Sequence, residues 1–369
     1  MDKIPLVDLQ AQYRSIKKEI DAAIQHILDT NQFIGGAPLA DFERNFAKFC
    51  GKPYAVGTSS GTSALYTVLK ALDIREGDEV ITVPNTFIAT SEVVNECGAA
   101  VKFVDVEEGS FLMDPELLKK AITPKTKAVI PVHLYGQSCD MKAISEICGD
   151  KVAIIEDACQ AHGAKQHGKR VPVTDIGCFS FYPGKNLGAY GDAGAIVCED
   201  EAFALTCAQF IDHGRKKGEK YVHHALGSNY RMDTLQAAIL DVKLRHLDSW
   251  TQARRKVASW YNELLDGKVI TPVEKKGNEH VYHLYVIQSR DRHGLLEHLH
   301  KQGIMAGAHY PVALHLQPSY AYLGLKKGSF PISEQFCESC VSLPVYPEMT
   351  KEQVAFVAEQ VMAFESARP

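Results

Sequence analysis

The chain has 369 residues, of which 46% are hydrophobic and 23% charged, and its formal net charge is −5. This length suits one large domain and one smaller one. No long basic run suggests binding to nucleic acid or to a membrane surface, and no apolar run approaches the roughly 18 residues of a membrane span. Because the N-terminus is polar and lacks an apolar signal core, we expect a cytoplasmic protein.

The ten cysteines are scattered, and several stand inside apolar runs, as in proteins of a reducing compartment. Cys337 and Cys340 form a lone CxxC pair, with no second pair and no redox-type surroundings. We interpret them as neighbours on one helix and expect no metal site; a metal or redox role is the less favoured alternative.

The predicted elements begin with two helices, at 9–30 and 38–49. From about residue 53 to 200, short apolar runs alternate with helical patterns such as 62–72 and 86–96. Strands that alternate with helices predict a largely parallel sheet with helices on both faces. The predicted strands are 54–57, 79–83, 101–106, 128–133, 152–156, 178–181 and 194–198.

After residue 197 the pattern becomes mainly helical, with helices at 233–247 and 249–265. A second α/β unit follows near 281–288, and two further helices are expected near 294–302 and 350–365. We therefore predict a large domain of residues 1–247 and a small C-terminal domain of residues 248–369. In parallel sheets, ligands bind beyond the carboxyl ends of the strands, so functional residues are sought there.

Residues 180–194 (SFYPGKNLGAYGDAG) place Lys185 in a glycine-rich turn between two apolar runs. A lysine that attacks a carbonyl group must be held in place, partly desolvated and ready to lose its proton. An ordinary surface lysine in a loop is the alternative interpretation.

Three further segments follow predicted strands. Asp157 ends a buried run, where a carboxylate needs a partner: a pyridinium N–H, a structural arginine or a helix N-terminus. Residues 57–65 (GTSSGTSAL) form either a phosphate cradle at a helix N-terminus or a simple capped turn. Phe87 could cover a flat ring, or belong to the core. None of these segments is a GxGxxG motif or a P-loop.

Taken together and in this order, these pieces resemble the fold-type I pyridoxal-phosphate (PLP) enzymes. More narrowly, the chain is similar to the DegT/DnrJ-type aminotransferases of nucleotide-linked keto sugars. The resemblance extends over nearly the whole chain, from residues 4–9 to 315–318. It implies an α/β fold-type I PLP-transferase, with a mostly parallel central sheet between helices and a smaller C-terminal α/β domain. The motifs that carry it are 57–65, 156–162 (EDACQAH), 180–194 and 227–233 (GSNYRMD).

The resemblance implies a role for each of four residues around the cofactor ring. Lys185 would be the catalytic lysine that binds PLP and later acts as the general base. Asp157 would keep the pyridine nitrogen protonated, which makes PLP a better electron sink. Gln160 would hydrogen-bond the phenolic oxygen of the ring, and Phe87 would stack on its face.

The resemblance also implies how the 5′-phosphate is held. Gly61, Thr62 and Ser180 would contact it, and Asn229 would reach it from the neighbouring subunit. The protein would then be a homodimer with shared active sites. L-glutamate, the usual amino donor of the family, would load the cofactor, and a keto sugar would receive the amino group in a second half-reaction.

Residues 183–192 (PGKNLGAYGD) are similar to family members that aminate C3 of a dTDP-linked 3-keto-6-deoxyhexose, for deoxyamino sugars of lipopolysaccharide or other glycans. Tyr182 and His309 are candidates to line the sugar pocket. Lys220 or Arg231 could reach the pyrophosphate, which needs cationic partners. For each of these residues, a helix cap or a structural salt bridge is the alternative.

Other functions stay open at this point. The acceptor could be a UDP-sugar, or amination could occur at C4. A PLP-binding sensor or pseudo-enzyme is a second class, although Lys185, Asp157 and Gln160 are all intact. A nicotinamide-dependent oxidoreductase is disfavoured because GxGxxG is missing. Cys159 departs from the family, in which a small residue such as alanine is expected.

Overall fold

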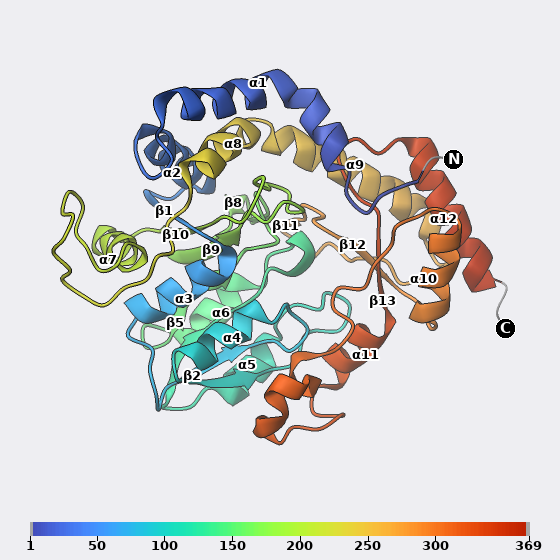
Figure 1. Ribbon diagram of the computed structural model, residues 1–369. Helices are drawn as coiled ribbons and strands as arrows, with labels where there is room; N and C mark the ends of the chain where they lie inside the picture. Colours follow the sequence, from blue (N-terminus) through green and yellow to red (C-terminus); the bar gives the residue numbers. More distant parts are fainter. Residues whose placement is uncertain (1–2, 367–369) are drawn as a thin grey trace.

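The computed structural model describes residues 3–366 and shows a central sheet between helices, followed by a second, smaller α/β unit (Figure 1). The N-terminal helix α1 (Leu9–Thr30) has the predicted bounds, and Asp8 caps it by accepting a hydrogen bond from the Ala11 N–H at 2.9 Å. Helix α2 (Ala37–Cys50) follows after a short turn.

The central sheet consists of two ladders that meet in one extended strand. β5 and β6 are consecutive, and between them the Ile155 N–H donates to the Val129 carbonyl at 3.0 Å, so that the strand order is β3-β2-β4-β5/β6-β9-β10-β1. The strands are β1 (Tyr54–Thr58), β2 (Glu79–Thr82), β3 (Ala100–Phe103), β4 (Thr126–Val129), β5 (Ala153–Ile154), β6 (Glu156–Asp157), β9 (Ile176–Ser180) and β10 (Gly194–Cys198).

One strand departs from the parallel arrangement. β10 is antiparallel to both of its neighbours, β1 and β9, whereas the other pairings in the sheet are parallel. The chain returns from β9 to β10 directly through residues 181–193, without the crossover helix that a parallel connection needs. The predicted largely parallel α/β fold is confirmed, and this direct return is the segment that contains Lys185.

Side chains of the central strands alternate between two cores. In β9, Phe179 packs beneath α2 and α8 (Thr234–Leu244), as does Phe181 directly after the strand, whereas Cys178 faces the cluster formed with α3 (Gly61–Ala71). In β10, Val197 joins the first core and Ile196 the second. Because successive side chains point to opposite faces, a strand buried on both faces reads as a continuous apolar run.

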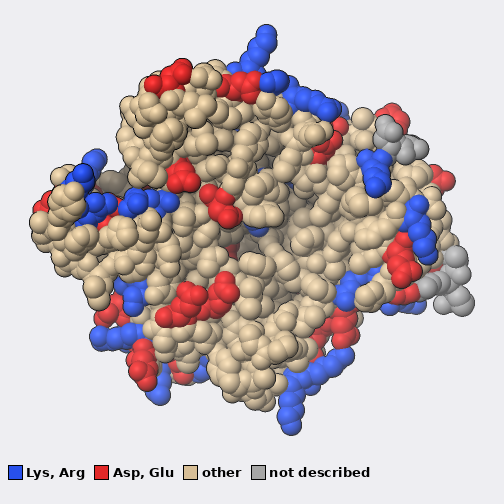
Figure 2. Space-filling model, in the orientation of Figure 1, with Lys and Arg blue, Asp and Glu red and all other residues tan. Residues whose placement is uncertain are grey.

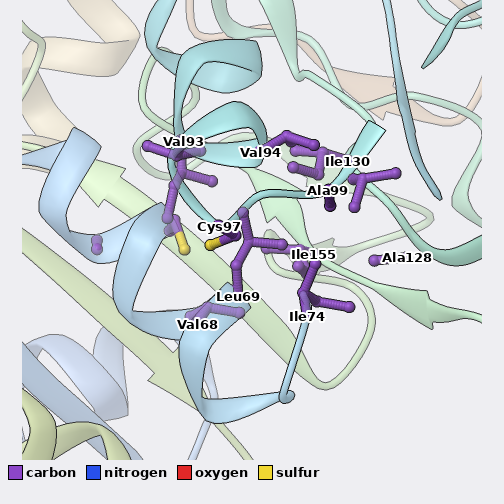
Figure 3. Packing of buried hydrophobic residues seen from close by; sticks show 14 of the residues in the cluster. Val68, Leu69, Ile74, Val93, Val94, Cys97, Ala99, Ala128, Ile130 and Ile155 are labelled. Atoms are coloured by element: carbon purple, nitrogen blue, oxygen red, sulfur yellow. The ribbon is translucent and has the colours of Figure 1, made fainter. Parts of the chain in front are cut away.

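The α3-side core is the larger packing unit that holds the sheet (Figure 3). Val68 and Leu69 of α3 and Val93 of α4 (Ala89–Glu96) meet Ile130 and Ile155 there, which directly follow β4 and β5. All five side chains are fully buried. Helix α7 (Glu201–Ile211) packs against the same core, whereas α5 (Pro115–Ala121) and α6 (Met141–Cys148) pack in a separate cluster.

Two predicted helices differ in their bounds from those in the structure. The helix predicted at 86–96 begins at Ala89, and the helix predicted at 233–247 ends at Leu244. A new helix, α9 (Leu247–Leu265), then leads to the smaller unit. Its remaining elements are β12 (Tyr285–Gln288), α10 (Arg292–Lys301), α11 (Pro331–Ser339), β13 (Cys340–Leu343) and α12 (Lys351–Ser366). A small separate sheet pairs β7 (Lys165–Gln166) and β8 (Lys169–Arg170), which lie between β6 and β9 in the chain, with β11 (Asn278–Glu279).

In the smaller unit β12 and β13 pair in antiparallel fashion. The N-terminal Ile4 packs into the same hydrophobic cluster and donates its N–H to the Gly303 carbonyl at 2.9 Å. The division at 247/248 stays a prediction. The interpretation of the CxxC pair as helix neighbours is wrong in part, because Cys337 lies in α11 and Cys340 opens β13.

Within residues 3–366, every helix is too short or too polar to cross a lipid bilayer. The same residues contain no group of three or more His, Cys, Asp or Glu side chains arranged to hold a metal ion.

Replacing Leu69 by Ala should lower stability by about 2–5 kcal/mol, because a buried leucine leaves a cavity that its neighbours only partly fill. The matched control is Leu205→Ala on α7, where the leucine is 59% exposed and the loss should be small. Urea unfolding followed by circular dichroism measures both. Equal losses in the two variants would contradict the packing described here.

Candidate active site

The predicted residues converge on the edge of the sheet at which the parallel strands end. β1 leads to Gly61, β2 leads to Phe87, β6 ends at Asp157 and β9 ends at Ser180. Residues from four separate strands therefore share one edge, as expected for ligand sites of parallel sheets. The face shown in Figure 2 carries scattered charges of both signs and is hollowed near its middle.

Lys185 sits in a tightly closed turn between β9 and β10. Its N–H donates to the Tyr182 carbonyl at 2.8 Å, and the Ala189 N–H donates to the Phe181 carbonyl at 2.7 Å. A Cβ atom at Gly188 would lie 2.3 Å from the Pro183 carbonyl oxygen, so the turn requires glycine there.

Burial lowers the pKa of Lys185, and the nearby Cys159 and Asp157 oppose that shift. Lys185 is half-buried, and it is held as the prediction requires: it is partly desolvated, near a carboxylate, and closer to giving up its proton than a surface lysine.

Asp157 is 5% exposed, and both of its carboxylate oxygens are held. The Thr90 hydroxyl donates to Oδ2 at 2.8 Å, and the Cys159 N–H donates to Oδ1 at 3.1 Å. Thr90 is in turn 3.2 Å from the hydroxyl of Thr86. These bonds fix the orientation of the Asp157 carboxylate without a cationic side chain. The alternative in which a structural arginine holds this carboxylate is therefore wrong.

The cradle predicted at 57–65 is closed from two sides. Ser60 caps α3 by accepting the Ser63 N–H at 3.0 Å, and the first N–H groups of the helix, at Gly61 and Thr62, have no acceptor within the helix. A Cβ atom at Gly61 would lie 2.7 Å from Cβ of Ser180 and 2.9 Å from Sγ of Cys159. Only glycine permits this approach, and it brings Ser180 beside the helix N-terminus.

An aromatic wall with Gln160 borders the site on another side. Phe87 is 51% exposed, and its ring centroid lies 5.6 Å from that of Tyr310. Gln160 donates through Nε2 to the Tyr310 hydroxyl at 3.1 Å and accepts the Tyr135 N–H through Oε1 at 2.8 Å. Burial raises the pKa of Tyr310, so its hydroxyl stays protonated near neutral pH.

Sequence reasoning missed Tyr310 and Thr90. Tyr310 could have been predicted, because it is an aromatic residue that directly follows His309, a predicted pocket residue. Thr90 carried no such signal, because its contact with Asp157 joins positions 67 residues apart.

Three histidines surround the lysine, and only His309 was predicted. Its Nδ1 lies 2.8 Å from the Ser342 hydroxyl, and burial, with the charge of Lys185, lowers its pKa. Burial lowers the pKa of His162 to about 3 and that of His283 well below the usual value, with a further contribution from Lys185 in both. The imidazoles are therefore neutral at physiological pH.

The remaining predicted residues lie at the periphery of the site. Tyr182 is 60% exposed, and Lys220 and Asn229 are exposed as well. Arg231 forms a salt bridge with Asp212, although its backbone lies beside Thr58 at the end of β1. The segment after α7 projects from the body of the molecule (Figure 1).

The arrangement fits PLP. An anion cradle with free N–H groups, a buried carboxylate, a desolvated lysine and an aromatic wall lie at one sheet edge. These are the groups that a planar cationic ring with a phosphate arm requires.

Comparison with known proteins agrees with this fit. Residues 14–362 match the DegT/DnrJ/EryC1/StrS aminotransferase family. The chain belongs to this family. The predicted family, fold and enzyme class are thereby confirmed, and the enzyme is a PLP-dependent aminotransferase.

Among curated relatives, the dTDP-3-amino-3,4,6-trideoxy-alpha-D-glucose transaminase of Streptomyces venezuelae is 40% identical, with 97% of this chain and 95% of the relative aligned. The UDP-N-acetyl-3-dehydro-alpha-D-glucosamine 3-aminotransferase of Acidithiobacillus ferrooxidans is also 40% identical, over 96% of both chains. A protein of Geobacillus stearothermophilus described as a pleiotropic regulatory protein is 42% identical over 98% of both chains.

Solved structures of relatives superpose closely on this chain. S. venezuelae DesV, in complex with a ketimine intermediate, has a TM-score of 0.97 at 39% identity, with both chains covered completely. NtdA of Bacillus subtilis, with the amine form of the cofactor (PMP) bound, has a TM-score of 0.87 at 32% identity, with 98% of this chain and 86% of that chain covered.

Gly61→Ala should weaken PLP binding while the protein still folds, because the added Cβ enters the space between α3 and Ser180. Overpacking of this size costs about 1–3 kcal/mol, which corresponds to a rise in Kd of about fivefold to 150-fold. Fluorescence titration with PLP measures the Kd, and the unfolding temperature without PLP is the control. An unchanged Kd would mean that the cradle does not hold the phosphate.

Proposed function

We propose that the enzyme transfers an amino group from L-glutamate to C3 of a dTDP-linked 3-keto-6-deoxyhexose, in the synthesis of deoxyamino sugars for glycans such as lipopolysaccharide. The observation that carries this proposal is the partly desolvated Lys185 near the buried, oriented Asp157, next to the Gly61–Ser180 cradle. The relatives support a sugar-nucleotide substrate, and they include both dTDP- and UDP-sugar enzymes.

When bound, PLP supplies an electron sink that stabilises negative charge at the carbon losing a proton. Around it, the chain provides the groups that hold and move protons. Asp157, fixed by Thr90 and the Cys159 N–H, would face the ring nitrogen and keep it protonated. Gln160 would meet the phenolic oxygen, and Phe87 would cover the ring face.

Lys185 would carry the proton between donor carbon and cofactor carbon. Its Nζ must be neutral to accept a proton, and the lowered pKa raises the neutral fraction. The neighbouring His162, His283 and His309 are neutral, so they add no negative charge that would hold the proton on Nζ. Gly61, Thr62 and Ser180 would anchor the phosphate throughout.

For the acceptor, we propose that Tyr182 and His309 contact the sugar and that Lys220 reaches the pyrophosphate. Lys220 is exposed, so that its ammonium can meet an anion from solution, and its Nζ lies 5.4 Å from the centroid of the Tyr221 ring. Arg231 is the alternative cation, but its salt bridge with Asp212 would first have to open or be shared.

A regulatory or sensor function is the second candidate, favoured by the relative described as a pleiotropic regulatory protein. It predicts a protein that binds PLP and a sugar nucleotide without turnover. The partly desolvated lysine weighs against it, since a sensor has no use for a proton carrier.

All ten cysteines are free thiols and nine are buried, which supports a reducing, cytoplasmic environment.

We further propose a homodimer in which Asn229 completes the phosphate site of the other subunit. The segment before Asn229 exposes Tyr221 (80%), Val222 (55%) and Leu226 (95%). Apolar side chains this exposed on a projecting segment favour a protein partner, and a second copy of the chain has the same surface to offer.

Adding L-glutamate to the PLP-loaded enzyme should replace the visible band of bound PLP with the near-ultraviolet band of its amine form. A dTDP-linked 3-keto-6-deoxyhexose should then restore the visible band faster than a UDP-linked 3-keto sugar. Lys185→Ala should abolish both changes, whereas Lys142→Ala on the exposed face of α6 should not. A stable visible band with glutamate would favour the sensor; recovery that is faster with the UDP-sugar would replace the proposed acceptor.

Asn229→Ala should retain PLP poorly, and Lys185→Ala should be inactive. Mixed after subunit exchange, the two variants should regain about a quarter of wild-type activity, because half of the dimers are mixed and each contains one intact site. Activity and bound PLP per dimer are measured before and after mixing, with each variant alone as control. No recovery, with dimers confirmed by light scattering, would argue against shared sites.

A further inference from the structure

A second lysine is buried directly against the turn that carries Lys185. Lys243 on α8 is 0% exposed, and its Nζ donates to the Gly188 carbonyl at 2.7 Å. The same Nζ lies 4.1 Å from the ring centroid of Tyr190. Both contacts fall within the short return between β9 and β10.

This placement is costly for the fold. Burial lowers the pKa of Lys243 to about 7, and among the described residues no charged side chain contributes to offset that shift. A buried ammonium without a carboxylate partner is destabilising, and replacing buried charges by apolar side chains of similar volume is often neutral or stabilising. Packing alone therefore gives no reason for a lysine at this position, where methionine would fill the same space.

The contact of Lys243 with the Gly188 carbonyl ties the turn to α8. α8 holds the return between strands at two points: Gln236 accepts the Tyr190 N–H through Oε1 at 2.8 Å, and Lys243 binds the Gly188 carbonyl. Asn186 adds a third point by donating to the Val281 carbonyl at 3.0 Å. Without Lys243, the buried Gly188 carbonyl, three residues after Lys185, would lose the one side-chain donor that reaches it from α8.

We propose that Lys243 is a positioning residue for Lys185, which holds the turn between β9 and β10 through the Gly188 carbonyl and so keeps the catalytic lysine beside Asp157. The inference rests on the proposed role of Lys185. It assigns Lys243 no contact with substrate or cofactor. The residue acts by limiting the opening of the turn, which would move Lys185 away from the sheet edge and into water.

The test compares Lys243→Met with Lys52→Met. Lys52 is a matched control, since its side chain is 7% exposed and it pairs with Glu199 at the far end of β1 and β10, away from the turn. Three quantities are measured on the full-length protein: the unfolding temperature, hydrogen exchange of amides 181–190, and the rate at which PLP is captured on Lys185, trapped by borohydride and located by mass spectrometry.

For Lys243→Met we expect an equal or higher unfolding temperature, exchange at 181–190 that is faster by about tenfold, and capture on Lys185 that is slower by about tenfold. A tenfold change is the size expected when a buried carbonyl loses one hydrogen-bond donor. Lys52→Met should leave the exchange and the capture at wild-type values. The combination of retained stability with a loosened turn separates positioning from a merely structural role.

A lower unfolding temperature with faster exchange along all of α8 and unchanged capture would overturn the proposal, as would unchanged exchange at 181–190. If Lys243→Met does not fold, Lys243→Leu decides, because it too removes the donor to the Gly188 carbonyl and leaves every residue of the turn in place: faster exchange and slower capture support the proposal, and unchanged values overturn it. Absence of capture on Lys185 in the wild-type protein would instead refute the proposed function, while the exchange result would still report on the turn.

Discussion

The site depends on limiting the contact of one amine with water at the edge of the sheet. Desolvation disfavours the ammonium form of Lys185, while Asp157 and Cys159 favour it, and the balance leaves the pKa below that of a surface lysine. A flexible turn could not maintain this balance, since water would reach the amine each time the turn opened. The rigidity of residues 181–193 is therefore a condition for the chemistry, and the hydrogen bonds from Ala189 and Lys243 serve it.

The sheet supplies that rigidity because both of its faces are covered. Alternate residues of β9 and β10 enter two separate cores, so neither strand can shift its register without exposing one of them. The direct return to the antiparallel β10 then places Lys185 over the same edge at which β6 presents Asp157 and β9 presents Ser180. Gly61 completes the arrangement, because its missing Cβ lets the N-terminus of α3 approach Ser180 closely.

The fold could be predicted well from local patterns. The period-3.6 pattern gave α1 with its bounds, and the apolar runs located each strand of the central sheet to within a few residues. The reversal of β10 could not be predicted in this way, since strand direction leaves no local pattern. Cys340 was misplaced on a helix because the change from α11 to β13 falls inside a short buried segment in which both periods fit.

The sequence by itself determined which chemical groups are present and in what order: a lysine in a glycine-rich turn, an acid after a buried strand and a small-residue turn before a helix. Local composition is enough for this, because turns, caps and buried strands have residue preferences of their own. Only the tertiary structure decided what these groups meet. The bonds of Asp157 to Thr90, of Gln160 to Tyr310 and of Lys243 to the turn join positions far apart in the chain, and packing alone brings such residues together.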